Sequence, residues 1–176
     1  WWEQSEKRDF VRKQLKNSRN INPEDVVNSL KNSKRKNMTS TVTFPKGNIA
    51  PEGSVVKSTA IDKTVIDDDG VYRKIGPARI FISEADAIKA VKDNGANGIK
   101  AGDIMVVVCG GPKGTGMQEV AQITIALKYL SYGKEVALIT DGRFSGVSTG
   151  ACIGHIGPEA LDGGPIGKLK ENDLIE

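Results

Sequence analysis

The sequence predicts an α/β domain that follows an N-terminal helical arm. Residues 1–38 are strongly charged and carry only a thin apolar stripe, which is typical of surface helices. Residues 39–82 consist of short β-prone runs separated by turn residues. Residues 104–140 follow a strand–loop–helix–strand order, which is typical of a parallel sheet. We therefore expect the arm to span residues 1–38 and the α/β domain to span residues 39–176.

The composition is that of an ordinary globular chain. Its 176 residues suit one core, with 38% hydrophobic and 27% charged residues. The longest apolar runs are far below the roughly 20 residues that cross a bilayer, and no signal segment opens the chain. Cys109 and Cys152 are too few for a disulfide framework. We therefore expect no membrane association and a reducing, cytoplasmic location.

The net charge of +3 is concentrated in the arm. Residues 1–40 hold ten Lys and Arg against five Asp and Glu, including a basic cluster at residues 31–36. Aromatic residues do not alternate with this cluster, and a solvated helix face explains it equally well. We therefore expect no nucleic-acid binding.

The arm is predicted to contain two helices. The first covers Glu3–Lys16, and the second begins at Pro23, after the capping residue Asn22, and extends to about Ser33. The chain opens on two tryptophans without an initiator methionine and ends within a strand-like run. We therefore expect it to be a piece of a longer protein.

The α/β domain is predicted to begin with β-rich structure. We expect strands over the runs Thr41–Phe44, Ser54–Ala60, Val71–Ile75 and Ala78–Ile82. Pro, Gly and Asp–Gly pairs separate these runs and predict turns between them.

A parallel crossover is predicted to follow. Ser83 caps a helix that stops near residues 94–95, and a buried strand covers Ile104–Cys109. An amphipathic helix then runs from Val120 to near Gly133, and a second strand covers Glu135–Thr140. Because consecutive parallel strands end at the same edge of a sheet, the loops after both strands should emerge together. That edge is the expected place for a site.

The first of these loops, residues 110–119, is rich in glycine but fits neither the P-loop nor the dinucleotide fingerprint. Glu119 is predicted in the first helical turn after it. Its carboxylate could ligate a hard cation such as Mg²⁺. Alternatively, Glu119 is an acid that stabilises the helix N-terminus, and spacing alone favours this second interpretation.

The second loop, residues 140–150, places hydroxyls, an acid and a guanidinium directly after a buried strand. Such a mixture indicates a polar ligand. Ser145 is a candidate nucleophile or activated base, although Gly-x-Ser-x-Gly is missing and a simple turn serine is the alternative. His155 is either a structural donor or a substrate contact. Paired with Cys152 it lacks an orienting third group, so we do not expect a thiol hydrolase.

At these loops the sequence resembles the C-terminal part of the dihydroxy-acid and phosphogluconate dehydratase family. The resemblance covers nearly all of the chain. It rests on motifs in the family's order, at Gly47–Gly53, Gly76–Phe81, Gly111–Met117 with Glu119, Ala137–Gly146, Gly154–Ala160 and Gly163–Ile166. The arm, the insertion at residues 61–72 and the run at residues 145–152 resemble the aldonate branch more than the branched-chain amino-acid branch.

The resemblance implies a swivelling, β-barrel-like C-terminal domain flanked by helices, with its site facing an N-terminal domain and often a partner subunit. We therefore expect a homo-oligomer at full length. It further implies a hydro-lyase that removes water from a sugar acid such as D-xylonate, giving a 2-keto-3-deoxy acid. Family enzymes use Mg²⁺ and an iron–sulfur cluster on three cysteines of the N-terminal domain. This chain holds none of those cysteines, so we expect it to bind no cluster and to be inactive alone.

Carried over residue by residue, the resemblance makes Glu119 a Mg²⁺ ligand and Ser145 the base that takes the C2 proton. Asp141 and Arg143 would shape the loop of that serine. A serine acts as a base only where nearby metal charge lowers its pKa strongly.

Some family members carry threonine two residues after the serine, where this chain has Val147. Ser148 and Thr149 are the candidates for the missing substrate contact. Two other functions stay open at this point. One is the dihydroxy-acid dehydratase of branched-chain amino-acid biosynthesis, and the other is a stand-alone module that binds a ligand without catalysis.

Overall fold

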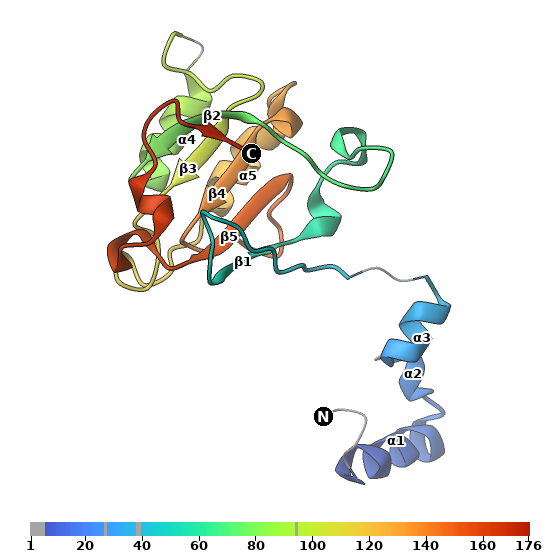
Figure 1. Cartoon of the computed structure of the whole chain (residues 1–176). Coiled ribbons are helices and arrows are strands. Elements are labelled where there is room, and N and C mark those ends of the chain that lie inside the picture. The colour runs from blue at the N-terminus through green and yellow to red at the C-terminus, as the bar shows by residue number, and fades with distance from the viewer. Residues whose placement is uncertain (1–5, 27, 38–39, 94) are drawn as a thin grey trace. The chain divides into compact units, whose positions relative to one another are not determined.

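A computed structural model describes residues 6–26, 28–37, 40–93 and 95–176. The chain divides into two compact units, Trp1–Ser40 and Thr41–Glu176. The two opening tryptophans and the expected boundary at residue 38 lie outside the described residues. Figure 1 shows both units, with the sheet and its helices in the second one.

The first unit contains α1 (Glu6–Arg19), α2 (Pro23–Val26) and α3 (Leu30–Arg35). Helix α1 agrees with the first predicted helix of the arm. The prediction of one continuous second helix is wrong, because a new helix begins at Leu30. Ser29 has an extended backbone, and its hydroxyl accepts the Asn32 N–H at 3.1 Å, which caps α3.

The second unit is built on a six-stranded sheet. In spatial order its strands are β1 (Gly53–Val56), β5 (Ala151–Gly157), β4 (Ala137–Thr140), β3 (Ile104–Val107), β2 (Gly76–Phe81) and β6 (Leu174–Ile175). The four central strands are parallel, and the two outer strands are antiparallel to their neighbours. The sheet curls into half a barrel (Figure 1). The expected barrel-like α/β domain is confirmed.

The predicted parallel crossover from β3 to β4 is present, and a second one joins β2 to β3. Strands β2, β3 and β4 form where the apolar runs predict them, with α4 (Glu84–Lys92) between β2 and β3 and α5 (Ala121–Lys128) between β3 and β4. The Ser83 hydroxyl accepts the Asp86 N–H at 3.1 Å and caps α4 as predicted. Because Val107 of β3 pairs with Thr140 of β4, both strands end at the same edge of the sheet.

Two of the four strands predicted over residues 39–82 form, and two do not. Only β1 and β2 of this segment join the sheet. The runs at residues 41–44 and 71–75 each contribute one isolated bridge, and residues 58–60 form a 3₁₀ helix. The Pro, Gly and Asp residues around these two runs favour turns over continued strand pairing.

Strand β5 has no counterpart in the predicted elements. Its sequence contains two glycines and a histidine, which weakens a local strand signal. It forms because β1 pairs with it on one side and β4 on the other, so tertiary pairing outweighs local propensity.

The sheet buries a core on each face. In β3, Met105 and Val107 face α4 and α5, whereas Ile104 and Val106 face the opposite side, as the two-residue period of a strand requires. Helix α5 adds Ile123 and Leu127 to the helix-side core.

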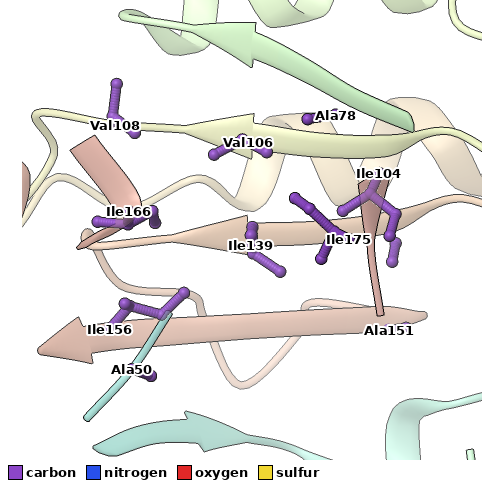
Figure 2. Close-up of a cluster of buried hydrophobic side chains, with 11 residues drawn as sticks. Ala50, Ala78, Ile104, Val106, Val108, Ile139, Ala151, Ile156, Ile166 and Ile175 are labelled. Atoms are coloured by element: carbon purple, nitrogen blue, oxygen red, sulfur yellow. The ribbon is translucent and has the colours of Figure 1, made fainter. Parts of the chain in front are cut away.

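On the inner face of the half-barrel, irregular segments cover the sheet. Figure 2 shows Ala50 and Ile166, which come from segments outside the strands, in one cluster with Ile175 of the edge strand β6 and the side chains of the central strands. Ile166 comes from the 3₁₀ helix Pro165–Lys168, which follows β5. The chain after β5 is therefore held close to the carboxyl ends of the strands.

We predict that Ile123→Ala lowers the free energy of unfolding by about 2–5 kcal/mol, since its side chain is fully buried between α5 and the sheet. The matched control is Ile125→Ala on the same helix, where the side chain is 44% exposed and the expected cost is below about 1 kcal/mol. Urea unfolding of both variants measures the difference. Equal losses would contradict the placement of α5.

Candidate active site

The candidate site is formed by the two loops that leave the carboxyl ends of β3 and β4. Their backbones pair directly, because the Arg143 N–H donates to the Gln118 carbonyl at 3.0 Å and the Val120 N–H donates to the Arg143 carbonyl at 2.9 Å. These two bonds make a parallel bridge between Glu119 and Arg143. The predicted meeting of the loops at one sheet edge is confirmed.

Glu119 lies before α5 and not in its first turn, which corrects the predicted position. The helix begins at Ala121, and Glu119 has extended backbone because of its bridge to Arg143. At that helix end, Glu84 of α4 accepts the Gln122 N–H at 3.1 Å. The Glu119 carboxylate is 37% exposed and lies 3.4 Å from the Arg143 guanidinium.

Asp141 is almost completely buried and directs its carboxylate at backbone donors. One oxygen accepts the Gly110 N–H at 2.9 Å, and the other accepts the N–H groups of Cys109 at 3.2 Å and Ala160 at 2.9 Å. A carboxylate whose lone pairs are used in this way is poorly placed to bind a ligand. Asp141 therefore fits the predicted role of shaping the loop.

Ser145 lies in a tight turn and is half-buried. Its N–H donates to the Ser148 hydroxyl at 3.1 Å, and its carbonyl accepts the Ser148 N–H at 3.0 Å. The Val147 N–H donates to the Ser145 hydroxyl at 3.3 Å. Ser145 is thus a turn serine, and its Oγ also receives an N–H that favours an anionic oxygen.

The other candidate residues separate into buried and exposed groups. Ser148 is buried, and its hydroxyl closes the turn of Ser145. The Thr149 hydroxyl donates to the Thr124 carbonyl of α5 at 3.5 Å, so it faces the helix. His155 is exposed on β5 and packs edge-on against Phe144, with ring centroids 5.8 Å apart.

His155 adjoins a cavity of about 280 Å³ that Met117 and Asp141 also line. Although the His155 side chain is exposed overall, partial desolvation of its ring and, secondly, the Arg143 guanidinium lower its pKa, which favours the neutral ring at pH 7. The structure thus brings His155 beside both loops, where a neutral imidazole can donate or accept one hydrogen bond.

Backbone strain gathers at this edge. Among the described residues, the non-glycine residues with left-handed φ are three asparagines, which tolerate it, and Cys109, Met117 and His155. Their φ angles are 66°, 69° and 55°. Such conformations cost about 1–3 kcal/mol each and persist only where the surroundings hold them. All three lie where the loops emerge.

The cysteines do not fit an iron–sulfur cluster. Cys152 is buried in the core on the helix side, whereas Cys109 packs against the core on the other face. Burial raises the pKa of Cys152 to about 12, and burial with the negative charges of Asp141 and Glu159 raises that of Cys109. Two thiols on opposite faces cannot share one cluster.

The fit to Mg²⁺ is partial. In the described ranges, no three His, Cys, Asp or Glu side chains gather in a metal-binding group. Glu119 presents a partly exposed carboxylate at the bridge that joins the two loops. Since Mg²⁺ sites in proteins use one or two carboxylates together with water and substrate oxygens, Glu119 fits as a single ligand of a larger site.

Glu159 was not among the candidates, although it lies in one of the quoted motifs. Its buried carboxylate accepts the Lys113 N–H of the first loop at 2.9 and 3.1 Å. The only signal in the sequence is an acid that follows a Gly–Pro pair, and this does not reveal a partner 46 residues away.

Comparison with known proteins places this fold and these loops in one family. Residues 25–176 match the model described as dihydroxy-acid/6-phosphogluconate dehydratase C-terminal. The chain belongs to this dehydratase family. It matches the family's C-terminal domain, which confirms the resemblance seen in the motifs.

The relatives support the expected branch. The D-xylonate dehydratases YagF and YjhG of Escherichia coli K12 are each 58% identical over all 176 residues. A dihydroxy-acid dehydratase of Renibacterium salmoninarum is 45% identical over 160 residues, or 88% of this chain. The chain spans 26% of the length of each of these three relatives. Within the described part of the chain, no helix has the length and apolar character to span a membrane.

Thiol labelling tests the placement of the cysteines. We predict that iodoacetamide at pH 8 modifies Cys109 slowly and leaves Cys152 unmodified in the folded chain, because both raised pKa values keep the thiols protonated. Raising the pH should accelerate labelling of Cys109 about tenfold per unit while the pH stays below its pKa. Peptide mass spectrometry locates the label, and urea-unfolded chain serves as the control. Rapid labelling of native Cys152 would contradict its burial.

Proposed function

We propose that this chain is the C-terminal domain of a Mg²⁺-dependent hydro-lyase that removes water from a sugar acid of the D-xylonate type. The observation that carries the proposal is the 58% identity to two D-xylonate dehydratases along the whole chain. Identity to dihydroxy-acid dehydratases is lower, at 45% for the relative from Renibacterium salmoninarum, which favours a sugar acid over a branched-chain substrate.

Ser145 is the group to which we assign the proton transfer. Its Oγ would take the proton from C2, and the electron pair left behind would form the C2–C3 double bond. The C3 hydroxyl would take up a proton and leave as water, and the enol would become the 2-keto-3-deoxy acid. The Val147 N–H at 3.3 Å supports this role, since a hydrogen bond to the oxygen favours its deprotonated form.

Glu119 and Arg143 would form the part of the site that holds Mg²⁺. Glu119 would hold Mg²⁺, which when bound supplies positive charge that orients an α-hydroxy carboxylate and acidifies groups beside it. Arg143 lies 3.4 Å from Glu119 and fixes the carboxylate at the loop surface. Its own Nε–H donates to the Met117 carbonyl at 2.8 Å, which keeps both loops in register.

The remaining candidates have supporting roles in this proposal. Asp141 and Ser148 are buried and shape the loops, and His155 would contact a substrate hydroxyl from the adjoining cavity. Thr149 faces α5 and is the weaker candidate for a substrate contact. The iron–sulfur cluster, the other Mg²⁺ ligands and the subunit contacts would belong to the three quarters of the relatives' length outside this chain.

We predict that Ser145→Ala in the full-length protein lowers turnover of D-xylonate about a hundredfold to ten-thousandfold, the usual loss for a general base. Keto-acid formation and exchange of the C2 proton in deuterated water measure the effect. Ser131→Ala, an exposed serine after α5, is the matched control and should leave both rates unchanged. If Ser145→Ala exchanges the C2 proton at the parent rate, Ser145 is not the base.

Glu119→Gln is expected to weaken Mg²⁺ binding and turnover together, because an amide oxygen is a poorer ligand for a hard cation than a carboxylate. Titration calorimetry with Mg²⁺ and turnover at several Mg²⁺ concentrations give the two measurements. The control is Glu135→Gln, which alters an exposed acid just before β4, at the opposite end of that strand. Parent turnover at every Mg²⁺ concentration would assign Glu119 a purely structural role.

A further inference from the structure

Glu159 occupies the corner where the chain leaves β5. Its side chain is buried, and both carboxylate oxygens accept the Lys113 N–H of the first loop. The Lys113 ammonium pairs with Asp162. The Glu159 carboxylate therefore acts on the backbone of the loop, and the lysine charge is neutralised by another acid.

The backbone hydrogen bonds of the first loop converge on Gly111, which packs against the Glu159 carboxylate. The Gly111 carbonyl accepts the N–H groups of Gly114, Thr115 and Met117 at 3.1 to 3.3 Å. A Cβ at Gly111 would lie 2.2 Å from the Glu159 Oε2, so the backbone is packed directly against the carboxylate. Displacing Gly111 would thus displace the donors that define the loop.

Hydrogen bonds lead from this centre to the groups of the proposed site. Gln118 donates its N–H to the Gly110 carbonyl at 3.0 Å, and Gln118 in turn accepts the Arg143 N–H. The Met117 carbonyl accepts the Arg143 guanidinium at 2.8 Å. Glu119 follows immediately and pairs with Arg143. A shift of the loop therefore moves Glu119 and Arg143 together.

The same corner also holds the second loop. Ala160, the next residue, donates its N–H to the Asp141 carboxylate at 2.9 Å, and Asp141 begins the loop that carries Ser145. Two consecutive residues after β5 thus fix one loop each. These contacts add to the backbone bridge between Glu119 and Arg143 that already joins the two loops.

We propose that Glu159 is a positioning residue of the site, which sets Glu119 and Arg143 relative to Ser145 by anchoring the first loop. The expected effect of Glu159 on turnover rests on the proposed function. The expected effect on the loop is independent of that function. A displacement of about 1 Å can cost about a hundredfold in rate, and loss of a residue that orients a metal ligand typically costs about 10–100-fold in affinity or activity.

The test uses the full-length protein with Glu159→Ala, Glu159→Gln and the control Glu171→Ala. Glu171 is a matched control because its carboxylate also accepts a backbone N–H, that of Ile80 at 2.8 Å, but pairs with Arg79 away from the two loops. Three quantities are measured in each folded variant. They are amide hydrogen exchange of residues 109–118, Mg²⁺ affinity by calorimetry, and kcat and KM for D-xylonate.

In Glu159→Ala, the amides of residues 109–118 should exchange faster than in the parent protein. The variant should bind Mg²⁺ about 10–100-fold more weakly, and its kcat should fall by a similar factor. Glu159→Gln should recover most of each loss, because its amide oxygen still accepts the Lys113 N–H. Glu171→Ala should change none of the three. If Glu159→Ala does not fold, Gly111→Ala tests the same contact, since its Cβ pushes the loop away from an intact Glu159.

The proposal would be wrong if folded Glu159→Ala kept the amide exchange rates, the Mg²⁺ affinity and the kcat of the parent protein. The proposal would also be wrong if Glu159→Gln lost as much Mg²⁺ affinity and kcat as Glu159→Ala while its loop kept full exchange protection. In that case the negative charge of Glu159, and not its hold on the loop, would be responsible. If the parent protein shows no dehydratase activity, the proposed function fails separately, and loop exchange still decides the role of Glu159.

Discussion

Asp141 accepts hydrogen bonds from N–H groups that belong to the ends of two other strands. Cys109 and Gly110 follow β3, Ala160 follows β5, and Asp141 itself follows β4. This single carboxylate therefore fixes three neighbouring strand ends of the sheet. Hydrogen bonds to a buried charged group are worth about 1.5–3 kcal/mol each, which is comparable with the strain at Cys109. The left-handed backbone of Cys109 is stable because its own N–H is one of the three donors.

Close packing at this edge depends on positions where no side chain fits. A Cβ at Gly142 would lie 2.7 Å from the Gln118 carbonyl, which lets the two loops form their backbone bridge. A Cβ at Gly154 would lie 2.8 Å from the Phe144 ring, so that ring can reach His155. Glycine at these positions is thus a condition for the loops to meet, and any larger residue would separate them.

The sequence was sufficient for features that depend on local pattern. Apolar runs predicted β2, β3 and β4, the spacing of apolar residues predicted α5, and the capping serine predicted the start of α4. It was insufficient where long-range pairing decides the structure. Strand β5 contains two glycines and a histidine, which weaken its local strand signal, and it exists because it has a partner on each side. Likewise, the extended backbone of Glu119 depends on Arg143, which is 24 residues away in the sequence.

The hydrogen-bond partners of the acids divide them into two groups that the sequence alone could not separate. Asp141 and Glu159 are buried, and their carboxylates accept backbone N–H groups of the loops. Glu119 keeps 37% of its side chain exposed and faces only a guanidinium at 3.4 Å, so it retains lone pairs for another partner. The buried acids hold the loops through these backbone hydrogen bonds. The exposed acid can take part in chemistry because the buried ones already fix the backbone on which it stands.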